Sequence, residues 1–162
     1  MNKNFFLIQH PVIKRDVTIL RDKNTDSETF RAALQRVSNI LAVELSKEFR
    51  LTETEVETPL EKTQGAKLTH DIILVPVLRA GLGMVNGFLQ IIPEAKVGHI
   101  GLQRDEETLK PIEYYYKVPK HLETAEVVML DPMLATGGSA SEAGEDRVSV
   151  VAGGARSGRL VV

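Results

Sequence analysis

Residues 127–139 read VVMLDPMLATGGS, and this stretch decides the fold that the sequence predicts. The apolar run at residues 127–130 has the length and β-branched content of a buried strand, and it ends at Asp131 and Pro132. Small and hydroxyl residues follow, and their backbone N–H groups can curve around an anion where a helix begins: Ala135, Thr136, Gly137, Gly138 and Ser139. A carboxylate at a strand end suits ribose hydroxyls or Mg²⁺. The stretch therefore indicates a sugar-phosphate site, with an ordinary glycine-rich turn as the alternative.

Strands alternate with helices along the rest of the chain. Apolar residues at helical spacing predict a helix at residues 27–50, which Asp26 or Ser27 can cap, and a second helix at residues 82–92. Buried strands are predicted at residues 71–78, 96–102 and 127–130. This alternation predicts an α/β fold with a parallel sheet flanked by helices.

A small β-hairpin precedes the first of these buried strands. Residues 52–58 alternate with period two, and residues 62–65 are expected to turn the chain back. Glu53, Glu55 and Glu57 share one face of this hairpin. Three aligned carboxylates can suggest a metal site, but a solvated strand face is the favoured interpretation.

The composition is that of one globular domain without a nucleic-acid or membrane partner. The 162 residues include 20 basic and 22 acidic side chains, so no excess of positive charge favours nucleic acid. No apolar stretch approaches the roughly 20 residues of a membrane span, and the N-terminal apolar run is too short for a signal peptide. The absence of Cys excludes disulfides and thiolate ligands. We therefore expect a cytoplasmic protein.

The motif at residues 127–139 resembles the phosphoribosyl pyrophosphate binding motif of the type I phosphoribosyltransferases. With Asp131-Pro132 where many relatives carry two acids, it is similar to the uracil phosphoribosyltransferase family in particular. Four further stretches agree: RDKNT at residues 21–25, ETPLEKTQG at 57–65, VPVLRAGLGM at 75–84 and VGHIGLQRDEETLKPIEYYYKVP at 97–119. The resemblance covers residues 10–140. It implies a type I phosphoribosyltransferase fold and a pentosyltransferase of pyrimidine salvage, which converts uracil and phosphoribosyl pyrophosphate to UMP and diphosphate.

The resemblance also implies roles for individual residues. Arg79, Ala80 and Gly81 would hold the diphosphate through backbone N–H groups and a guanidinium whose planar set of donors suits that group. Arg104 matches an arginine placed on the diphosphate, in a loop that closes over the substrate. Asp131 would hold the ribose hydroxyls, and Asp131 and Arg104 are the expected catalytic residues. The remaining substrate-binding residues are Pro132, Met133, Leu134, Ala135, Thr136, Gly137, Gly138 and Ser139, and Mg²⁺ is expected to arrive on the diphosphate.

Two other interpretations stay open. Gly81, Gly83 and Gly87 are spaced loosely like a dinucleotide fingerprint, with Asp105 about 20 residues further on as the ribose acid. Against this, Arg79 stands between the strand and the first glycine, and the fingerprint normally follows the first strand. The other interpretation is a module that binds phosphoribosyl pyrophosphate without turnover.

Aromatic and imidazole side chains add little. Tyr114, Tyr115 and Tyr116 suggest a base-stacking platform, but successive strand residues face opposite ways, so at most alternate rings can share one surface. Packing of a return strand is the favoured interpretation. The four histidines show no ligand spacing.

Residues 141–162 do not match the family pattern. They hold four glycines, no aromatic residue and no proline, and they show no sustained apolar period. Family members continue with a helix, further strands and a segment that contacts the base. We therefore expect an incomplete phosphoribosyltransferase-like domain at residues 1–140 and a non-matching tail at 141–162, with Val127 and Met129 open to water and little or no uracil phosphoribosyltransferase activity. The family further implies a homo-oligomer and, in some bacterial members, activation by GTP.

Overall fold

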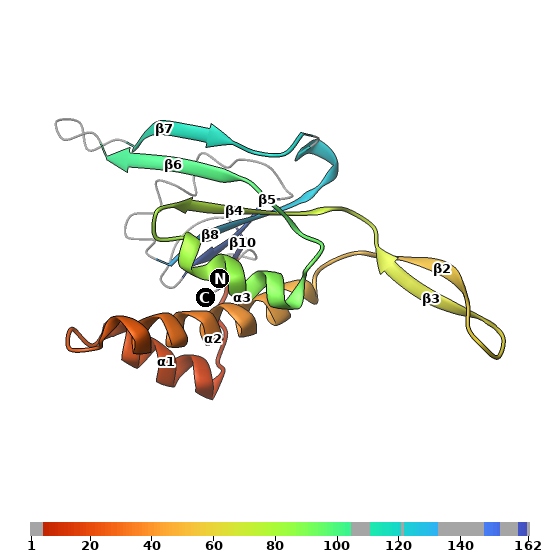
Figure 1. The fold of residues 1–162 in the computed structure, drawn as a ribbon, viewed down its shortest axis with the longest axis horizontal. Helices are drawn as coiled ribbons and strands as arrows, with labels where there is room; N and C mark the ends of the chain where they lie inside the picture. The colour runs from red at the N-terminus through yellow and green to blue at the C-terminus, as the bar shows by residue number, and fades with distance from the viewer. Residues whose placement is uncertain (1–4, 105–110, 121, 133–147, 153–158, 162) are drawn as a thin grey trace.

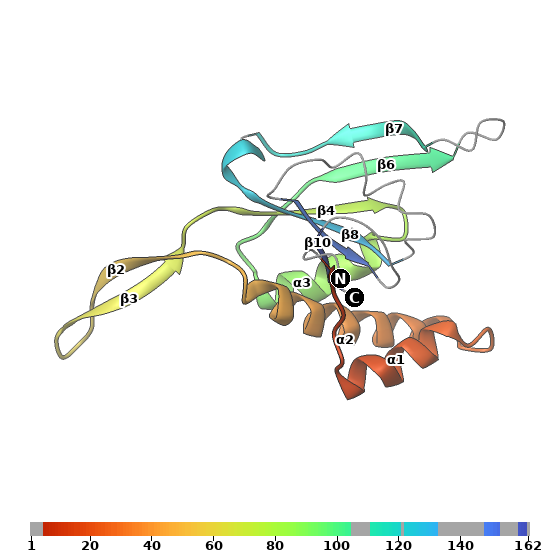
Figure 2. The same cartoon turned by 180° about the vertical axis from the view of Figure 1, so that it is seen from behind.

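The computed structural model describes residues 5–104, 111–120, 122–132, 148–152 and 159–161. A twisted sheet forms one layer, and three helices cover one of its faces (Figures 1 and 2). The strands follow the order β1-β10-β9-β8-β4-β6-β7, and β5 also pairs with β4. All pairs in this sheet are parallel except β6 with β7. The predicted α/β class with a mainly parallel sheet is therefore confirmed.

The bounds of the elements are as follows. The sheet contains β1 (Phe5–Phe6), β4 (Ile72–Leu78), β5 (Lys96–Val97), β6 (His99–Arg104), β7 (Pro111–Lys117), β8 (Glu126–Asp131), β9 (Val148–Ala152) and β10 (Arg159–Val161). The helices are α1 (Pro11–Arg21), α2 (Ser27–Ser46), α3 (Leu82–Ile91) and the short 3-10 helix η1 (Leu122–Thr124), and the hairpin consists of β2 (Leu51–Glu57) and β3 (Lys62–Leu68).

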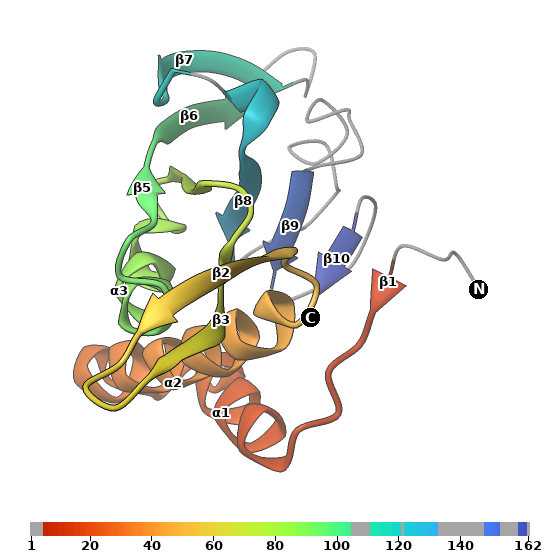
Figure 3. The ribbon, with the colours of Figure 1, turned by 90° about the vertical axis from the view of Figure 1, so that its right-hand side faces the viewer.

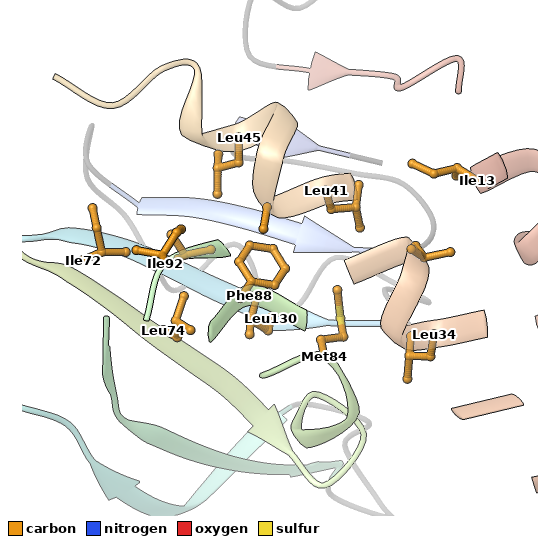
Figure 4. Packing of buried hydrophobic residues seen from close by; sticks show 13 residues of the cluster. Ile13, Leu34, Leu41, Leu45, Ile72, Leu74, Met84, Phe88, Ile92 and Leu130 are labelled. Atoms are coloured by element: carbon orange, nitrogen blue, oxygen red, sulfur yellow. The ribbon is translucent and has the colours of Figure 1, made fainter. Parts of the chain in front are cut away.

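The main core lies between the helices and the sheet. Phe88 of α3 is fully buried at its centre, and Leu41 of α2, Leu74 of β4 and Leu130 of β8 close around it (Figure 4). These side chains come from the continuous apolar runs of β4 and β8 and from one face of α2, as the periodicity predicts. A smaller cluster on the other face of β4 joins Ile73 and Val75 to Ala125. Both faces of β4 are therefore buried.

The predicted helix at residues 27–50 is α2, but it ends at Ser46. Asp26 caps it, because its Oδ1 accepts hydrogen bonds from the backbone N–H groups of Glu28 and Thr29, both at 2.9 Å. The hydrogen bond from the Thr29 N–H is the main reason that the pKa of Asp26 lies below its ordinary value. The predicted helix at 82–92 is α3, which ends one residue earlier.

The helix α1 is absent from the sequence prediction. Pro11 occupies its first turn, and the Nδ1 of His10 caps it by accepting a hydrogen bond from the Val12 N–H at 3.2 Å. Its buried face carries a carboxylate: the side chain of Asp16 is 0% exposed and forms ion pairs with Arg36 of α2 and with Arg15. A charged residue in the apolar stripe obscures the helical period, although Pro11 at the helix start was an available signal.

The hairpin is present, but its turn differs from the prediction. Residues 62–65 belong to β3, where Gly65 pairs with Thr54. The chain turns at residues 58–61 instead, where the Oγ1 of Thr58 accepts from the Glu61 N–H at 3.1 Å and donates to the Glu61 carbonyl at 2.7 Å. Side-chain hydrogen bonds of this kind define a turn as well as glycine does. Glu53, Glu55 and Glu57 are exposed, as expected of a solvated face.

The end of the chain also differs from expectation. The sequence predicts no strand after residue 130, yet β9 pairs with β8 and β10 pairs with β9 (Figure 3). Short β-branched segments such as that of β9 can pair without a long periodic pattern. Because β8 lies between β4 and β9, Val127 is half-buried and Met129 is only 5% exposed. The expectation that both would be open to water was wrong.

Candidate functional site at the carboxyl edge of the sheet

Three strands end together at one edge of the sheet. Pro76 of β4 stands level with Leu130 of β8, and Leu78 of β4 stands level with Gly101 of β6. Because these pairs are parallel, the carboxyl ends of β4, β6 and β8 point the same way. The edge beyond the carboxyl ends of parallel strands is where open α/β sheets bind ligands. Hence Arg79, Arg104 and Asp131, which the sequence places at three strand ends, share this edge.

The loop after β4 consists of residues 79–81 and leads directly into α3. The Leu78–Arg79 peptide bond is cis. From Gly81 onward the backbone N–H groups are already hydrogen-bonded: Gly81 donates to the Val77 carbonyl at 2.9 Å, and Leu82 donates to the Arg79 carbonyl at 3.2 Å. Within the described part of the chain, the N–H groups of Arg79 and Ala80 make no such backbone bond. The predicted diphosphate donors of this loop therefore reduce to two N–H groups and the Arg79 side chain.

The Arg79 side chain is the charged group of this loop. The side chain is exposed, and among the described residues it forms no hydrogen bond or ion pair. An exposed guanidinium without an acidic partner costs little to desolvate against an anion. Among the described residues, Arg79 thus forms no surface salt bridge, which is the plain structural role for an arginine at this position.

Gly81 fixes how closely this loop approaches β8. A Cβ built on Gly81 would meet the Leu130 carbonyl oxygen, and it would lie 2.7 Å from the Val77 nitrogen and 2.8 Å from the Val77 oxygen. The φ of Gly81 is −59°, which any residue adopts. Glycine is therefore required here for space and not for backbone conformation. No local sequence pattern indicates this contact, because it joins the loop after β4 to the end of β8, which is distant in the chain.

Asp131 is the last residue of β8. It is 8% exposed, and it lies one residue beyond the Leu130 carbonyl that Gly81 touches. Pro132 follows in a bend and is half-buried. The other predicted phosphate residues, Met133, Leu134, Ala135, Thr136, Gly137, Gly138 and Ser139, lie outside the described residues.

Arg104 ends β6, and its backbone pairs with Pro111 of β7. The backbone therefore places Arg104 at the same edge as Arg79 and Asp131. The predicted substrate-covering loop at residues 105–110, including Asp105, lies outside the described residues.

A β-bulge changes the arrangement of the tyrosines. Gly101 pairs with Tyr115 and Leu102 pairs with Glu113, so Tyr114 is an extra residue on β7. A Cβ on Gly101 would lie 2.6 Å from the Tyr114 ring and 2.9 Å from the Tyr115 Cβ. Both side chains thus lie over the same face of Gly101, and the expectation that successive tyrosines face opposite ways was wrong here. The three tyrosines are 42–54% exposed, so they do not form a packed strand face.

The third glycine of the dinucleotide alternative has a different role. A Cβ on Gly87 would lie 2.5 Å from the Ser38 Cβ on α2. Gly87 therefore allows α2 and α3 to pack closely and does not face the strand ends. The glycine spacing of this loop reflects helix packing as much as ligand binding.

The strand order and this edge define a type I phosphoribosyltransferase fold. The uracil phosphoribosyltransferase family model matches residues 7–150, and the chain belongs to this family. The match runs past residue 140, and the domain boundary predicted there stays a prediction.

Curated relatives agree with the family assignment. Uracil phosphoribosyltransferase of Finegoldia magna is 53% identical over 138 residues, which cover 85% of this chain and 66% of that protein. The enzyme of the same name from Salinibacter ruber is 48% identical over 139 residues, covering 86% and 66%. The chain thus spans just under two thirds of the length of these relatives.

Solved structures show the same fold. A protein from Aquifex aeolicus superposes with a TM-score of 0.82 and 38% identity, over 91% of this chain and 74% of that protein. A hypoxanthine-guanine phosphoribosyltransferase from Bacillus anthracis has a TM-score of 0.55 at 11% identity, over 81% of this chain and 76% of that one. The second similarity concerns the fold alone. No described helix is long and apolar enough to cross a membrane.

Proposed function

We propose that this chain acts as a uracil phosphoribosyltransferase, which binds phosphoribosyl pyrophosphate at the carboxyl edge of the sheet and transfers its ribosyl phosphate to uracil. In this reaction the bond from the ribose anomeric carbon to the diphosphate oxygen breaks. A bond from that carbon to a uracil ring nitrogen forms, the nitrogen loses its proton, and UMP and diphosphate are released. The observation that carries the proposal is the shared edge of Arg79 and Asp131 in a chain of this family.

The charges at the edge suit the two ends of the donor. The Arg79 guanidinium and the N–H groups of Arg79 and Ala80 would neutralise the diphosphate as its bond to ribose breaks. Asp131 would accept hydrogen bonds from the ribose hydroxyls, which fixes the anomeric carbon between the two groups. Arg104 would add a second positive charge to the diphosphate from the end of β6.

The residues at this edge fit a magnesium ion that arrives with the diphosphate. Mg²⁺ keeps several waters and is commonly held by one or two carboxylates together with substrate phosphates. Asp131 offers a carboxylate at the right edge. The described residues contain no cluster of three or more His, Cys, Asp or Glu for a metal, so an all-protein magnesium cage is not part of the proposal. When bound, the ion would supply charge neutralisation on the diphosphate.

The test is titration calorimetry of the whole chain with phosphoribosyl pyrophosphate, with and without Mg²⁺. Folding is checked on the same sample by circular dichroism. We expect binding that strengthens with Mg²⁺, and we expect ribose 5-phosphate to bind more weakly because it lacks the diphosphate. The proposal is contradicted if a folded sample does not bind phosphoribosyl pyrophosphate, or if it binds NAD more tightly than phosphoribosyl pyrophosphate.

Turnover is tested separately by measuring diphosphate release with uracil, and with hypoxanthine as the control base. Release that depends on uracil supports the full reaction and would contradict the expectation, drawn from residues 141–162, of little or no activity. Donor binding without release supports the alternative of a module that binds phosphoribosyl pyrophosphate without turnover. The resemblance also motivates a homo-oligomer and GTP activation, for which light scattering and the same release assay with added GTP are the measurements.

A further inference from the structure

The loop after β4 and the end of β8 approach each other closely at Gly81. A Cβ added to Gly81 would clash with three backbone atoms. These are the Leu130 oxygen and the nitrogen and oxygen of Val77, which lie 2.7 and 2.8 Å from the Cβ position. The backbone of paired strands cannot rotate away as a side-chain tip can. Any residue larger than glycine must therefore move the loop relative to both Leu130 of β8 and Val77 of β4.

The two partners of this contact lie directly beside the two proposed ligand-binding groups. Gly81 stands two residues from Arg79, and its N–H anchors the loop by donating to the Val77 carbonyl at 2.9 Å. Leu130 immediately precedes Asp131 at the end of β8. The distance between the diphosphate donors and the ribose carboxylate is thus set where Gly81 meets Leu130.

We infer that Gly81 is a positioning residue for the proposed reaction: it sets the spacing between the diphosphate loop, residues 79–80, and Asp131. This inference rests on the proposed function, but it changes the role of Gly81. Because its N–H is already bonded to Val77, Gly81 acts through the loop position and not by holding the diphosphate. A ligand that bridges both groups depends on this spacing, whereas a ligand that uses only one group does not.

The chain offers a matched control two residues away. A Cβ on Gly83 would lie 2.7 Å from the Leu34 Cδ2, the far end of a flexible side chain, and its next neighbour is at 3.9 Å. Gly83→Ala therefore makes the same chemical change in the same turn, but Leu34 can adjust to it. Gly81→Ala must displace the backbone on the order of 1 Å to restore ordinary contact distances.

The experiment compares both variants with the unaltered chain by calorimetry in the presence of Mg²⁺. For Gly81→Ala we expect the affinity for phosphoribosyl pyrophosphate to fall roughly 10- to 100-fold, the scale of a misplacement near 1 Å. The affinity for ribose 5-phosphate should change less than about threefold, and Gly83→Ala should leave both affinities within that range. Equal losses for both ligands in Gly81→Ala, or no loss for either, would overturn the inference. If the unaltered chain does not bind the donor, the proposed function fails before the role of Gly81 is addressed.

A second measurement covers the case in which Gly81→Ala does not fold. Amide hydrogen exchange on the unaltered chain reports on the Gly81 N–H directly. Phosphoribosyl pyrophosphate is proposed to bridge both sides of the site, whereas ribose 5-phosphate is proposed to contact the β8 side. The inference therefore predicts that phosphoribosyl pyrophosphate slows exchange at both Gly81 and Asp131, while ribose 5-phosphate slows exchange at Asp131 and leaves Gly81 unchanged. Slowed exchange at Asp131 but not at Gly81 with phosphoribosyl pyrophosphate, or equal slowing at Gly81 by both ligands, would contradict the inference.

Discussion

Arg36 of α2 holds the buried carboxylate of Asp16 on α1 with two hydrogen bonds, Nε to Oδ2 at 2.9 Å and Nη2 to Oδ1 at 3.1 Å. Arg15 adds a third, from its Nε to Oδ1 at 2.9 Å. Burial raises the pKa of Asp16, but the hydrogen bonds and charges of the two arginines outweigh it, so the pKa lies below its ordinary value of 3.8. This pair fixes α1 on α2 through charge in addition to apolar packing.

Replacing Asp16 by Asn should destabilise the chain in a pH-dependent way. A depressed carboxylate pKa stabilises the fold at pH values above the pKa of the unfolded chain, and this contribution is lost as the pH falls through the folded pKa. We expect Asp16→Asn to lower the free energy of unfolding by about 1 to 3 kcal/mol at pH 7, the scale of hydrogen bonds to charged groups. The difference from the unaltered chain should shrink below about pH 4. Urea unfolding at several pH values measures it, and a difference that does not vary with pH would contradict the assignment.

Phe88→Ala should create a cavity at the centre of the main core. The ring is fully buried between the helices and the sheet (Figure 4), and truncations of this kind typically cost about 3 to 5 kcal/mol. Ile91→Ala is the control on the same helix, because Ile91 is 39% exposed. We expect that variant to lose less than about 1 kcal/mol. Chemical denaturation of both variants gives the comparison, and similar losses would place the core elsewhere.

Arg79→Ala should weaken phosphoribosyl pyrophosphate more than ribose 5-phosphate. The guanidinium is proposed to contact the diphosphate, and loss of a charged hydrogen bond typically removes about 1.5 to 3 kcal/mol of binding. Arg79→Lys should recover only part of this loss, since an ammonium lacks the planar set of donors. Arg31→Ala, an exposed arginine on α2, is the control. The same pattern is expected for Arg104→Ala. If calorimetry shows equal losses of affinity for both ligands, these arginines do not contact the diphosphate.

Asp131→Asn should weaken both ligands to a similar extent, because both carry the ribose that Asp131 is proposed to bind. A loss of roughly 10-fold or more for each is expected from a charged hydrogen-bond acceptor. Asp71→Asn is a suitable control, since Asp71 is exposed and immediately precedes β4, at the opposite end of that strand. Unchanged affinity for ribose 5-phosphate in Asp131→Asn would argue against the ribose contact.

Gly101→Ala should disturb the β6–β7 pair, because the added methyl group would lie 2.6 Å from the Tyr114 ring. We expect a changed near-ultraviolet circular dichroism signal from the tyrosines and a lower melting temperature. Removing the ring in Gly101→Ala/Tyr114→Ala should recover part of the stability, since one of the two contacts is relieved. An additive loss in the double variant would instead mean that Gly101 and Tyr114 do not interact.

The sequence predicts those parts of the fold whose signals are local. The apolar runs of β4 and β8 are long, uninterrupted and bounded by turns, so both strands and the edge formed by Arg79 and Asp131 follow from the sequence. The helix α2 also follows, apart from its last turn. These elements can be predicted without knowing which other segments pack against them.

The features that the sequence did not predict share a physical cause. Each depends on an interaction with a second residue that the pattern of apolar residues does not reveal. The turn at residues 58–61 depends on the hydroxyl of Thr58, while the glycine that suggested a turn pairs with Thr54 inside β3. The helix α1 hides its period because Asp16 is buried only with the help of Arg36. The bulge at Tyr114 and the close contact of Gly81 with Leu130 exist only once separate strands lie side by side, so no local pattern reports them.

The β2–β3 hairpin has a consequence for how the molecule opens. Leu68 at its base is half-buried against the main core, whereas Leu60 near its tip is 96% exposed and every β2 residue except Thr54 is exposed. A two-stranded hairpin with two solvated faces gains little from burial and is at best marginally stable by itself. Its amides should therefore exchange through local unfolding of low free energy, while those of β4 require the global transition. We therefore expect the hairpin to open as a unit of its own, with Leu68 at its boundary to the main core.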